Sequence, residues 1–186
     1  MKIAVFCGSS TGNNPDFVQA TKVLGHYFGE QGIDLVYGGG KVGLMGTIAD
    51  AVLESGGKVF GVIPKYLEEK EIAHTGLTEL TIVTNMHERK AKMAEMADAF
   101  VALPGGAGTL EEIFEAWTWA QLGHHAKPCA FYNTNGFYNQ LIDMIGTMTD
   151  SGFLKPHYAN MLIQTNTPES LLTAINCYQA PQHKWT

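Results

Sequence analysis

The chain has 186 residues, of which 45% are hydrophobic and 16% charged, and its formal net charge is −6. This composition excludes a disordered or fibrous chain, and the acidic balance argues against a broad nucleic-acid-binding surface. The length suits one domain with a full-sized core, so we expect a single domain over residues 1–186.

The cysteine pattern and the hydropathy point to one compartment. Cys7, Cys129 and Cys177 are far apart and form no CxxC or metal-ligand spacing, which predicts reduced thiols. The residues 1–6 run directly into a strand pattern, so no secretory signal is expected. No apolar run approaches the roughly 18 residues of a membrane span. We therefore expect a cytoplasmic protein that contacts neither membrane nor nucleic acid.

Short β-rich segments alternate with helical segments along the chain. The expected strands are Lys2–Cys7, Ile33–Tyr37, Lys58–Ile63, Glu79–Thr84, Ala99–Leu103, Pro128–Tyr132 and, more weakly marked, Met161–Gln164. The expected helices are Pro15–Glu30, Gly43–Ser55, Met86–Ala97, Thr109–Leu122, Phe137–Asp150 and Pro168–Tyr178. Several strands are uninterrupted apolar runs, which is typical of parallel strands buried on both faces. The pattern predicts an α/β fold, a Rossmann-like doubly wound parallel sheet of about seven strands flanked by helices.

Three turns that follow strands are rich in glycine or small polar residues, and they cover residues 7–14, 38–43 and 104–109. Ligands of doubly wound sheets bind beyond the carboxyl ends of the strands, so these turns predict a shared polar rim. A glycine turn by itself often reflects only backbone conformation or close packing. Three of them at one edge favour a phosphate site, because helix N-termini present free N–H groups to an anion.

The second turn contains the pattern G-x-G-x-x-G, formed by Gly38, Gly40 and Gly43 between a strand and a helix. A dinucleotide site expects an acidic residue about 20 positions later, whereas the next strand ends at Ile63 without a carboxylate. The motif also follows the second expected strand rather than the first. We interpret it as a tight turn that lets the helix and any ligand approach closely, and we expect no NAD.

The third turn carries the most chemistry. Its sequence is Pro104-Gly105-Gly106-Ala107-Gly108-Thr109, and it leads into an expected helix. The glycines leave backbone N–H groups uncovered and Thr109 adds a hydroxyl, which suits a phosphate monoester at the positive end of a helix. No Gly-Lys-Ser/Thr closes the turn, so it is not a Walker A loop.

Two charged residues near helix starts are candidates for the site, and each has a structural alternative. Glu112 can form a capping box with Thr109, or it can be partly buried beside a bound anion, a setting that tunes a carboxylate for catalysis. Helical periodicity places Glu112, Ala116 and Trp119 opposite the apolar stripe, which favours a second packing partner there. Arg89 falls on the inward side of its helix, where a salt bridge, snorkelling or an anionic ligand would satisfy it.

Five ordered motifs resemble those of one family. They are FCGSS at 6–10, GGGKVGLMG at 38–46, MHERK at 86–90, PGGAGTLEE at 104–112 and TWAQLG at 118–123. From Lys2 to about Tyr178 the chain resembles the LONELY GUY phosphoribohydrolases, which release free cytokinin bases from their riboside 5′-monophosphates. Many members carry the label lysine decarboxylase, and the same architecture includes bacterial proteins that hydrolyse AMP.

The resemblance implies a hydrolase that breaks the N-glycosidic bond of a purine riboside 5′-monophosphate. It implies Arg89 and Glu112 as the catalytic pair. It also implies substrate contacts from Glu71, Arg89, Lys90, Gly105, Gly106, Ala107, Gly108, Thr109, Leu110, Glu111, Glu112 and Thr118. The expected partner is a small nucleoside 5′-monophosphate, and the expected assembly is a homodimer built partly on the side of Trp119. Neither a cofactor nor a metal is expected.

The implied residues suit the reaction. Loss of the base develops positive charge on the ribose, as in glycoside hydrolysis, and Glu112 can stabilise that charge and orient or deprotonate water. Arg89 stays protonated, so its role is to hold phosphate or ribose oxygens. AMP as the main substrate and a nucleotide-binding module without turnover remain alternatives. A decarboxylase would need a pyridoxal phosphate lysine, and nothing marks Lys41, Lys58, Lys65 or Lys127 as one.

Overall fold

The computed structural model describes residues 1–70 and 73–182 of the chain. Within these residues, seven strands form one parallel sheet in the order β4-β3-β2-β1-β5-β6-β7. The strands are β1 (Lys2–Phe6), β2 (Asp34–Tyr37), β3 (Val59–Pro64), β4 (Glu79–Val83), β5 (Ala99–Ala102), β6 (Cys129–Tyr132) and β7 (Leu162–Thr165). The predicted α/β class and doubly wound parallel sheet are confirmed.

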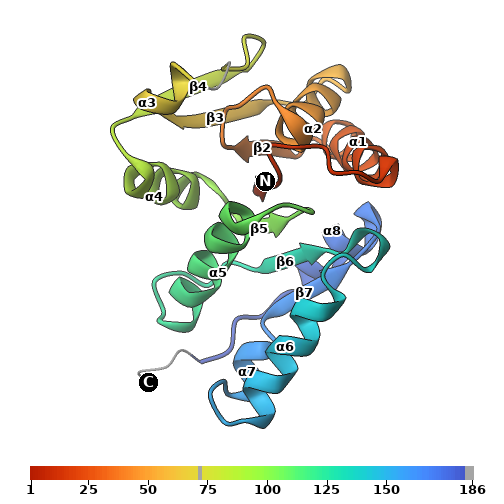
Figure 1. Cartoon of the computed structure of the whole chain (residues 1–186), viewed down its shortest axis with the longest axis vertical. Helices are drawn as coiled ribbons and strands as arrows, with labels where there is room; N and C mark the ends of the chain where they lie inside the picture. Colours follow the sequence, from red (N-terminus) through yellow and green to blue (C-terminus); the bar gives the residue numbers. More distant parts are fainter. Residues whose placement is uncertain (71–72, 183–186) are drawn as a thin grey trace.

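Helices cover both faces of the sheet. They are α1 (Pro15–Glu30), α2 (Gly43–Glu54), α3 (Lys65–Glu68), α4 (Met86–Met96), α5 (Ala107–Gln121), the 3₁₀ turn η1 (Thr134–Gly136), α6 (Asn139–Asp150), α7 (Pro156–Ala159) and α8 (Pro168–Cys177). Helices α1, α2 and α8 share one core, and α4 to α7 share the other (Figure 1). None of the helices in the described ranges has both the length and the apolar character of a membrane span.

Alternate residues of the central strands enter opposite cores. In β1, Ile3 and Val5 pack on the α1–α2–α8 side, whereas Ala4 and Phe6 pack on the α4–α7 side. All four are at most 5% exposed. A strand with helices on both faces needs apolar residues at every position, and this explains the uninterrupted apolar runs in the sequence.

The start of α4 is fixed by side chains. The backbone N–H of Glu88 donates to Oδ1 of Asn85 at 3.0 Å, and Oε2 of Glu88 accepts from the backbone N–H of Thr84 at 2.8 Å. This arrangement is a variant of the capping box, in which Glu88 accepts from the residue before the N-cap, and the hydrogen bond from Thr84 holds the pKa of Glu88 below the ordinary value. Because Arg89 is the next residue, the cap also sets the position of its side chain.

The order in which strands are added to the sheet reverses between β1 and β5. These strands are neighbours, with Ile3 paired to Ala99, while β2, β3 and β4 lie on one side of them and β6 and β7 on the other. Ligands of doubly wound folds bind at such a switch point. The three glycine-rich turns meet there: the Gly8 N–H donates to the Pro104 carbonyl at 3.1 Å, and the Leu44 N–H donates to the Gly8 carbonyl at 3.0 Å.

Candidate active site

Helix α5 begins directly after the third glycine turn, with Gly106 as its N-cap. Its first backbone bond runs from the Leu110 N–H to the Gly106 carbonyl at 3.2 Å, so the N–H groups of Ala107, Gly108 and Thr109 have no partner within the helix. A Cβ added at Gly106 or Gly108 would meet no protein atom within 4 Å. The helix therefore presents uncovered donors at its positive end, which suits an anion.

Gly105 has a different reason to be glycine. A Cβ there would collide with the side chain of Thr109, which is only 4% exposed. The turn is thus packed on its own first helical turn, and the Thr109 hydroxyl lies against Gly105. The positions of the turn with room for a larger group are Gly106 and Gly108.

Arg89 points from α4 toward α5 and faces Glu112. Its Nη1 lies 3.6 Å from Oε1 of Glu112, and the two side chains are 11% and 10% exposed. The Nε of Arg89 donates to the Val62 carbonyl at 3.2 Å. A Cβ at Gly38 would collide with the guanidinium, so the second glycine turn makes room for this arginine. The inward arginine has the anionic partner that its position required.

Glu112 is a buried carboxyl group whose charge is only partly compensated. Burial raises the pKa of Glu112 to about 7, while the positive charge of Arg89 opposes the rise. A pKa near neutrality suits a group that exchanges protons in a reaction. The capping-box interpretation of Glu112 is wrong: the N-cap is Gly106, it makes no side-chain cap bond, and Thr109 already lies inside the helix.

The pair opens onto a cleft of about 190 Å³ at the switch point. Its lining residues are Ser9, Met45, Met86, Arg89, Gly108, Glu111 and Glu112. Four of these were predicted site residues, whereas Ser9, Met45 and Met86 were not. The signal for Ser9 was present in the first glycine-rich turn, and Met86 belongs to the MHERK motif, but neither had been given a role.

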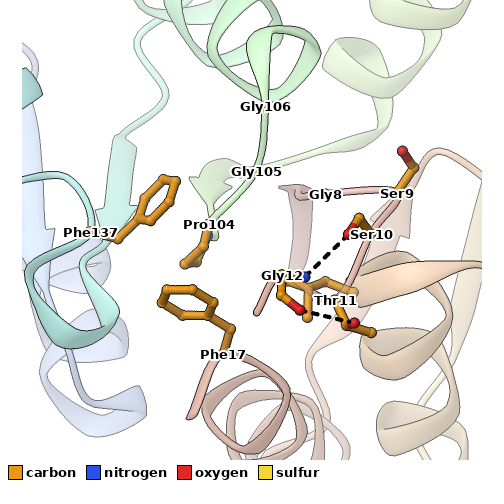
Figure 2. Close-up of a pocket in the computed structure, with 11 residues that line it drawn as sticks. Gly8, Ser9, Ser10, Thr11, Gly12, Phe17, Pro104, Gly105, Gly106 and Phe137 are labelled. Carbon is orange, nitrogen blue, oxygen red and sulfur yellow. Dashed lines mark hydrogen bonds between the residues drawn. The ribbon is translucent and has the colours of Figure 1, made fainter. Parts of the chain in front are cut away.

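A second cleft of about 310 Å³ lies against the same turn, and Gly105 and Gly106 line it (Figure 2). Its walls include Phe17 and Phe137, whose rings meet edge to face at 5.6 Å. The predicted contacts Gly105 and Gly106 thus face this second cleft rather than the one that holds Glu112.

The remaining predicted contacts lie elsewhere. Nζ of Lys90 pairs with Glu111 at 2.5 Å and Glu115 at 2.9 Å, and these hydrogen bonds outweigh burial and raise the pKa of Lys90. Lys90 therefore ties α4 to α5. Thr118 is exposed and lines neither cleft. Ala107, Thr109 and Leu110 line neither cleft, and Glu71 falls outside the described residues.

Helix α5 is buried over a wider arc than its periodicity predicted. Ala116 was expected beside Trp119 on the face away from the apolar stripe, but Ala116 is 4% exposed and belongs to the core. The core covers a wider arc of α5 than the predicted stripe, and at the next residue Nε1 of Trp117 donates to the Tyr158 carbonyl of α7 at 3.0 Å. Trp119 itself is half-buried.

The amino-acid sequence as a whole is similar to those of known proteins. A family described as "Possible lysine decarboxylase" matches residues 45–175. The cytokinin riboside 5′-monophosphate phosphoribohydrolase LOG7 of Arabidopsis thaliana is 47% identical over 178 residues, which cover 96% of this chain and 82% of the relative. The probable cytokinin riboside 5′-monophosphate phosphoribohydrolase LOGL2 of Oryza sativa subsp. japonica is 45% identical over 183 residues, which cover 98% of this chain and 75% of the relative.

Solved structures share the fold at low identity. A molybdenum cofactor carrier protein from Chlamydomonas reinhardtii superposes with a TM-score of 0.70 at 18% identity, covering 94% of each chain. A molybdenum cofactor binding protein from Rippkaea orientalis gives a TM-score of 0.69 at 19% identity, also covering 94% of each chain. These likenesses establish the architecture alone.

Proposed function

This chain belongs to the family of the cytokinin riboside 5′-monophosphate phosphoribohydrolases, and we propose that it hydrolyses the N-glycosidic bond of a purine riboside 5′-monophosphate. The products are the free base and ribose 5-phosphate. The observation that carries the proposal is the buried Glu112, which faces Arg89 in a cleft that reaches the uncovered start of α5.

The 5′-phosphate binds at the start of α5. The N–H groups of Ala107, Gly108 and Thr109 donate to its oxygens, and the helix dipole favours its charge. The cleft that contains Gly108 also contains Glu112, so a phosphate at the turn directs the attached ribose toward the carboxylate. Phosphate binding thus positions C1′ for the reaction as well as tethering the substrate.

Glu112 acts on water in its ionised form. It takes a proton from water, the water oxygen bonds to C1′, and the bond from C1′ to the base nitrogen breaks with its electron pair. The departing nitrogen takes up one proton and Glu112 gives up the proton that it took, directly or through solvent, so the reaction consumes one water and releases a neutral base. The carboxylate also stabilises the positive charge that develops on the ribose.

Arg89 keeps Glu112 available as a base. The guanidinium is always protonated, so it cannot accept a proton itself. Its charge opposes the effect of burial on the pKa of Glu112, which otherwise would be higher still. The same guanidinium lines the cleft and binds ribose or phosphate oxygens.

AMP is the second candidate substrate, because the same site would bind it. A base-release assay that compares AMP with isopentenyladenosine monophosphate separates the two. We expect release of isopentenyladenine to have the higher kcat/KM, following the relatives that are named for cytokinin nucleotides. A higher kcat/KM for AMP would make AMP nucleosidase the main activity. No base release from either nucleotide would leave a binding module.

We further propose that the whole chain acts as one cytoplasmic domain that forms a homodimer. The half-buried Trp119 on α5 supports an interface on that side. Cys7 and Cys129 are buried free thiols, as in a reducing compartment. Light scattering should give twice the 20.2 kDa of one chain, and cell fractionation should recover the activity from the cytosol.

A further inference from the structure

The first glycine-rich turn contributes a hydroxyl group that the proposed function does not yet use. Ser9, Ser10 and Thr11 follow β1 directly. Oγ of Ser10 accepts from the Gly12 N–H at 3.2 Å, and Oγ1 of Thr11 donates to the Gly12 carbonyl at 3.4 Å. Figure 2 shows the Ser9 side chain pointing away from both of these contacts. Within residues 1–70 and 73–182, Oγ of Ser9 makes no hydrogen bond.

Ser9 lies where the two clefts of the switch point meet. It lines the cleft of about 190 Å³ together with Gly108 and Glu112. It also lines the cleft of about 310 Å³ together with Gly105 and Gly106. In the described part of the chain, no other residue lines both clefts. Ser9, which follows β1, therefore lines the same space as Gly108 at the start of α5.

The backbone holds Ser9 in this place. Gly8, the residue before it, donates to the Pro104 carbonyl and accepts from the Leu44 N–H, so it is bonded to both other turns. Gly43 adopts φ +58°, and a Cβ there would collide with the backbone of Ser9. The position of Ser9 is thus fixed before any ligand arrives, which lowers the entropy cost of using its hydroxyl.

We propose that Ser9 is a further substrate-binding residue, whose hydroxyl donates a hydrogen bond to the 5′-phosphate in addition to those of the α5 amides. The inference rests on the proposed function for the identity of the ligand. A phosphate dianion offers only acceptors, and a serine hydroxyl can rotate to donate to it. The amides of α5 and the hydroxyl of Ser9 then hold the phosphate together.

Two variants and two measurements test the proposal. In Ser9→Ala, we expect ribose 5-phosphate to bind about tenfold more weakly by titration calorimetry, and kcat/KM for AMP to fall by a similar factor, because one hydrogen bond to a charged group is lost. Ser10→Ala is the matched control, since its hydroxyl is already used inside the turn, and it should bind ribose 5-phosphate as the unaltered protein does. Circular dichroism melting checks that both variants stay folded.

The outcomes separate this inference from the proposed function. Equal binding of ribose 5-phosphate by the unaltered protein and Ser9→Ala overturns the role of Ser9, whatever the activity. An equal loss in Ser9→Ala and Ser10→Ala also overturns it, because the effect then belongs to the shape of the turn. A protein that binds ribose 5-phosphate through Ser9 but releases no base from any nucleotide retains this inference and loses the proposed function.

Discussion

Two glycine-rich turns at the same edge of the sheet contain glycine for different reasons. In the turn 38–43, the protein itself excludes larger residues: a Cβ at Gly38 would collide with Arg89, and a Cβ at Gly43 would collide with the backbone of Ser9. In the turn 104–109, the same holds for Gly105, but a Cβ at Gly106 or Gly108 would point into open space. Glycine there keeps space and N–H groups uncovered for a ligand.

A structural turn and a binding turn can have similar sequences. Both sequences look like nucleotide-binding motifs, and G-x-G-x-x-G is the better known of the two. Only the space around each glycine separates them. The second turn supports the site indirectly, because it allows Arg89 to reach Glu112, whereas the third turn offers its own backbone to the substrate.

The largest expected effect is on substrates without a phosphate. If the turn 104–109 binds the 5′-phosphate, adenosine should have a kcat/KM at least about three orders of magnitude below that of AMP, because two or three charge-assisted hydrogen bonds are lost. Base release from both compounds under one set of conditions measures the ratio. Equal turnover of the two would mean that the third turn, like the second, is only structural.

The next effect concerns the carboxylate beside the third turn. Glu112→Gln should retain the fold and lower kcat for base release by about a hundredfold or more, the usual scale for a lost proton-transfer group. Glu111→Gln is the matched control, since Glu111 lines the same cleft but is more exposed and pairs with Lys90. Similar losses in both variants would assign the effect to the general charge of the cleft.

Replacing glycine by alanine should change the free energy of unfolding in opposite directions in the two turns. Gly43→Ala should lower the free energy of unfolding by about 2–4 kcal/mol, because φ is +58° and the methyl group meets backbone atoms. Gly108 lies inside α5, and a Cβ there would meet no protein atom within 4 Å. Gly108→Ala should therefore raise the free energy of unfolding by about 0.5–1 kcal/mol. Urea unfolding of both variants measures the contrast. Destabilisation in both would mean that the third turn is packed as tightly as the second.

A smaller effect follows from the pKa of Glu112. The pKa is about 7 in the folded chain and 4.5 in the unfolded chain, so the folded state holds the proton more tightly. This contribution to stability is complete below about pH 4.5 and is lost as the pH rises through 7. Between pH 5 and 8 the free energy of unfolding of the unaltered protein should fall by up to about 3 kcal/mol relative to that of Glu112→Gln. Parallel stability curves for the two proteins would show that Glu112 is not desolvated.

Much of the fold could be predicted from the sequence because local patterns determine it. The apolar runs of β3 and β5 predicted strands buried on both faces, and α1 begins and ends where expected. The one-turn helices α3 and α7 were missed, since four residues are too few for a periodic pattern.

The site was harder to predict because it depends on tertiary contacts. A capping box was one of two interpretations of Thr109 and Glu112, but a related arrangement formed at Asn85 and Glu88 instead, although both pairs have the required spacing. Arg89 on α4 and Glu112 on α5 lie 3.6 Å apart only because the two helices pack side by side. The unassigned Ser9 comes from a third segment of the chain, which only the sheet order brings close.

The most direct test of the difference between the two turns is the binding of ribose 5-phosphate to Gly108→Ala. Titration calorimetry should show binding at least about tenfold weaker than in the unaltered protein, because the added methyl group occupies the space that the phosphate needs. Thermal melting of the same sample should show no loss of stability. If Gly108→Ala binds ribose 5-phosphate as tightly as the unaltered protein, the start of α5 is not the phosphate site.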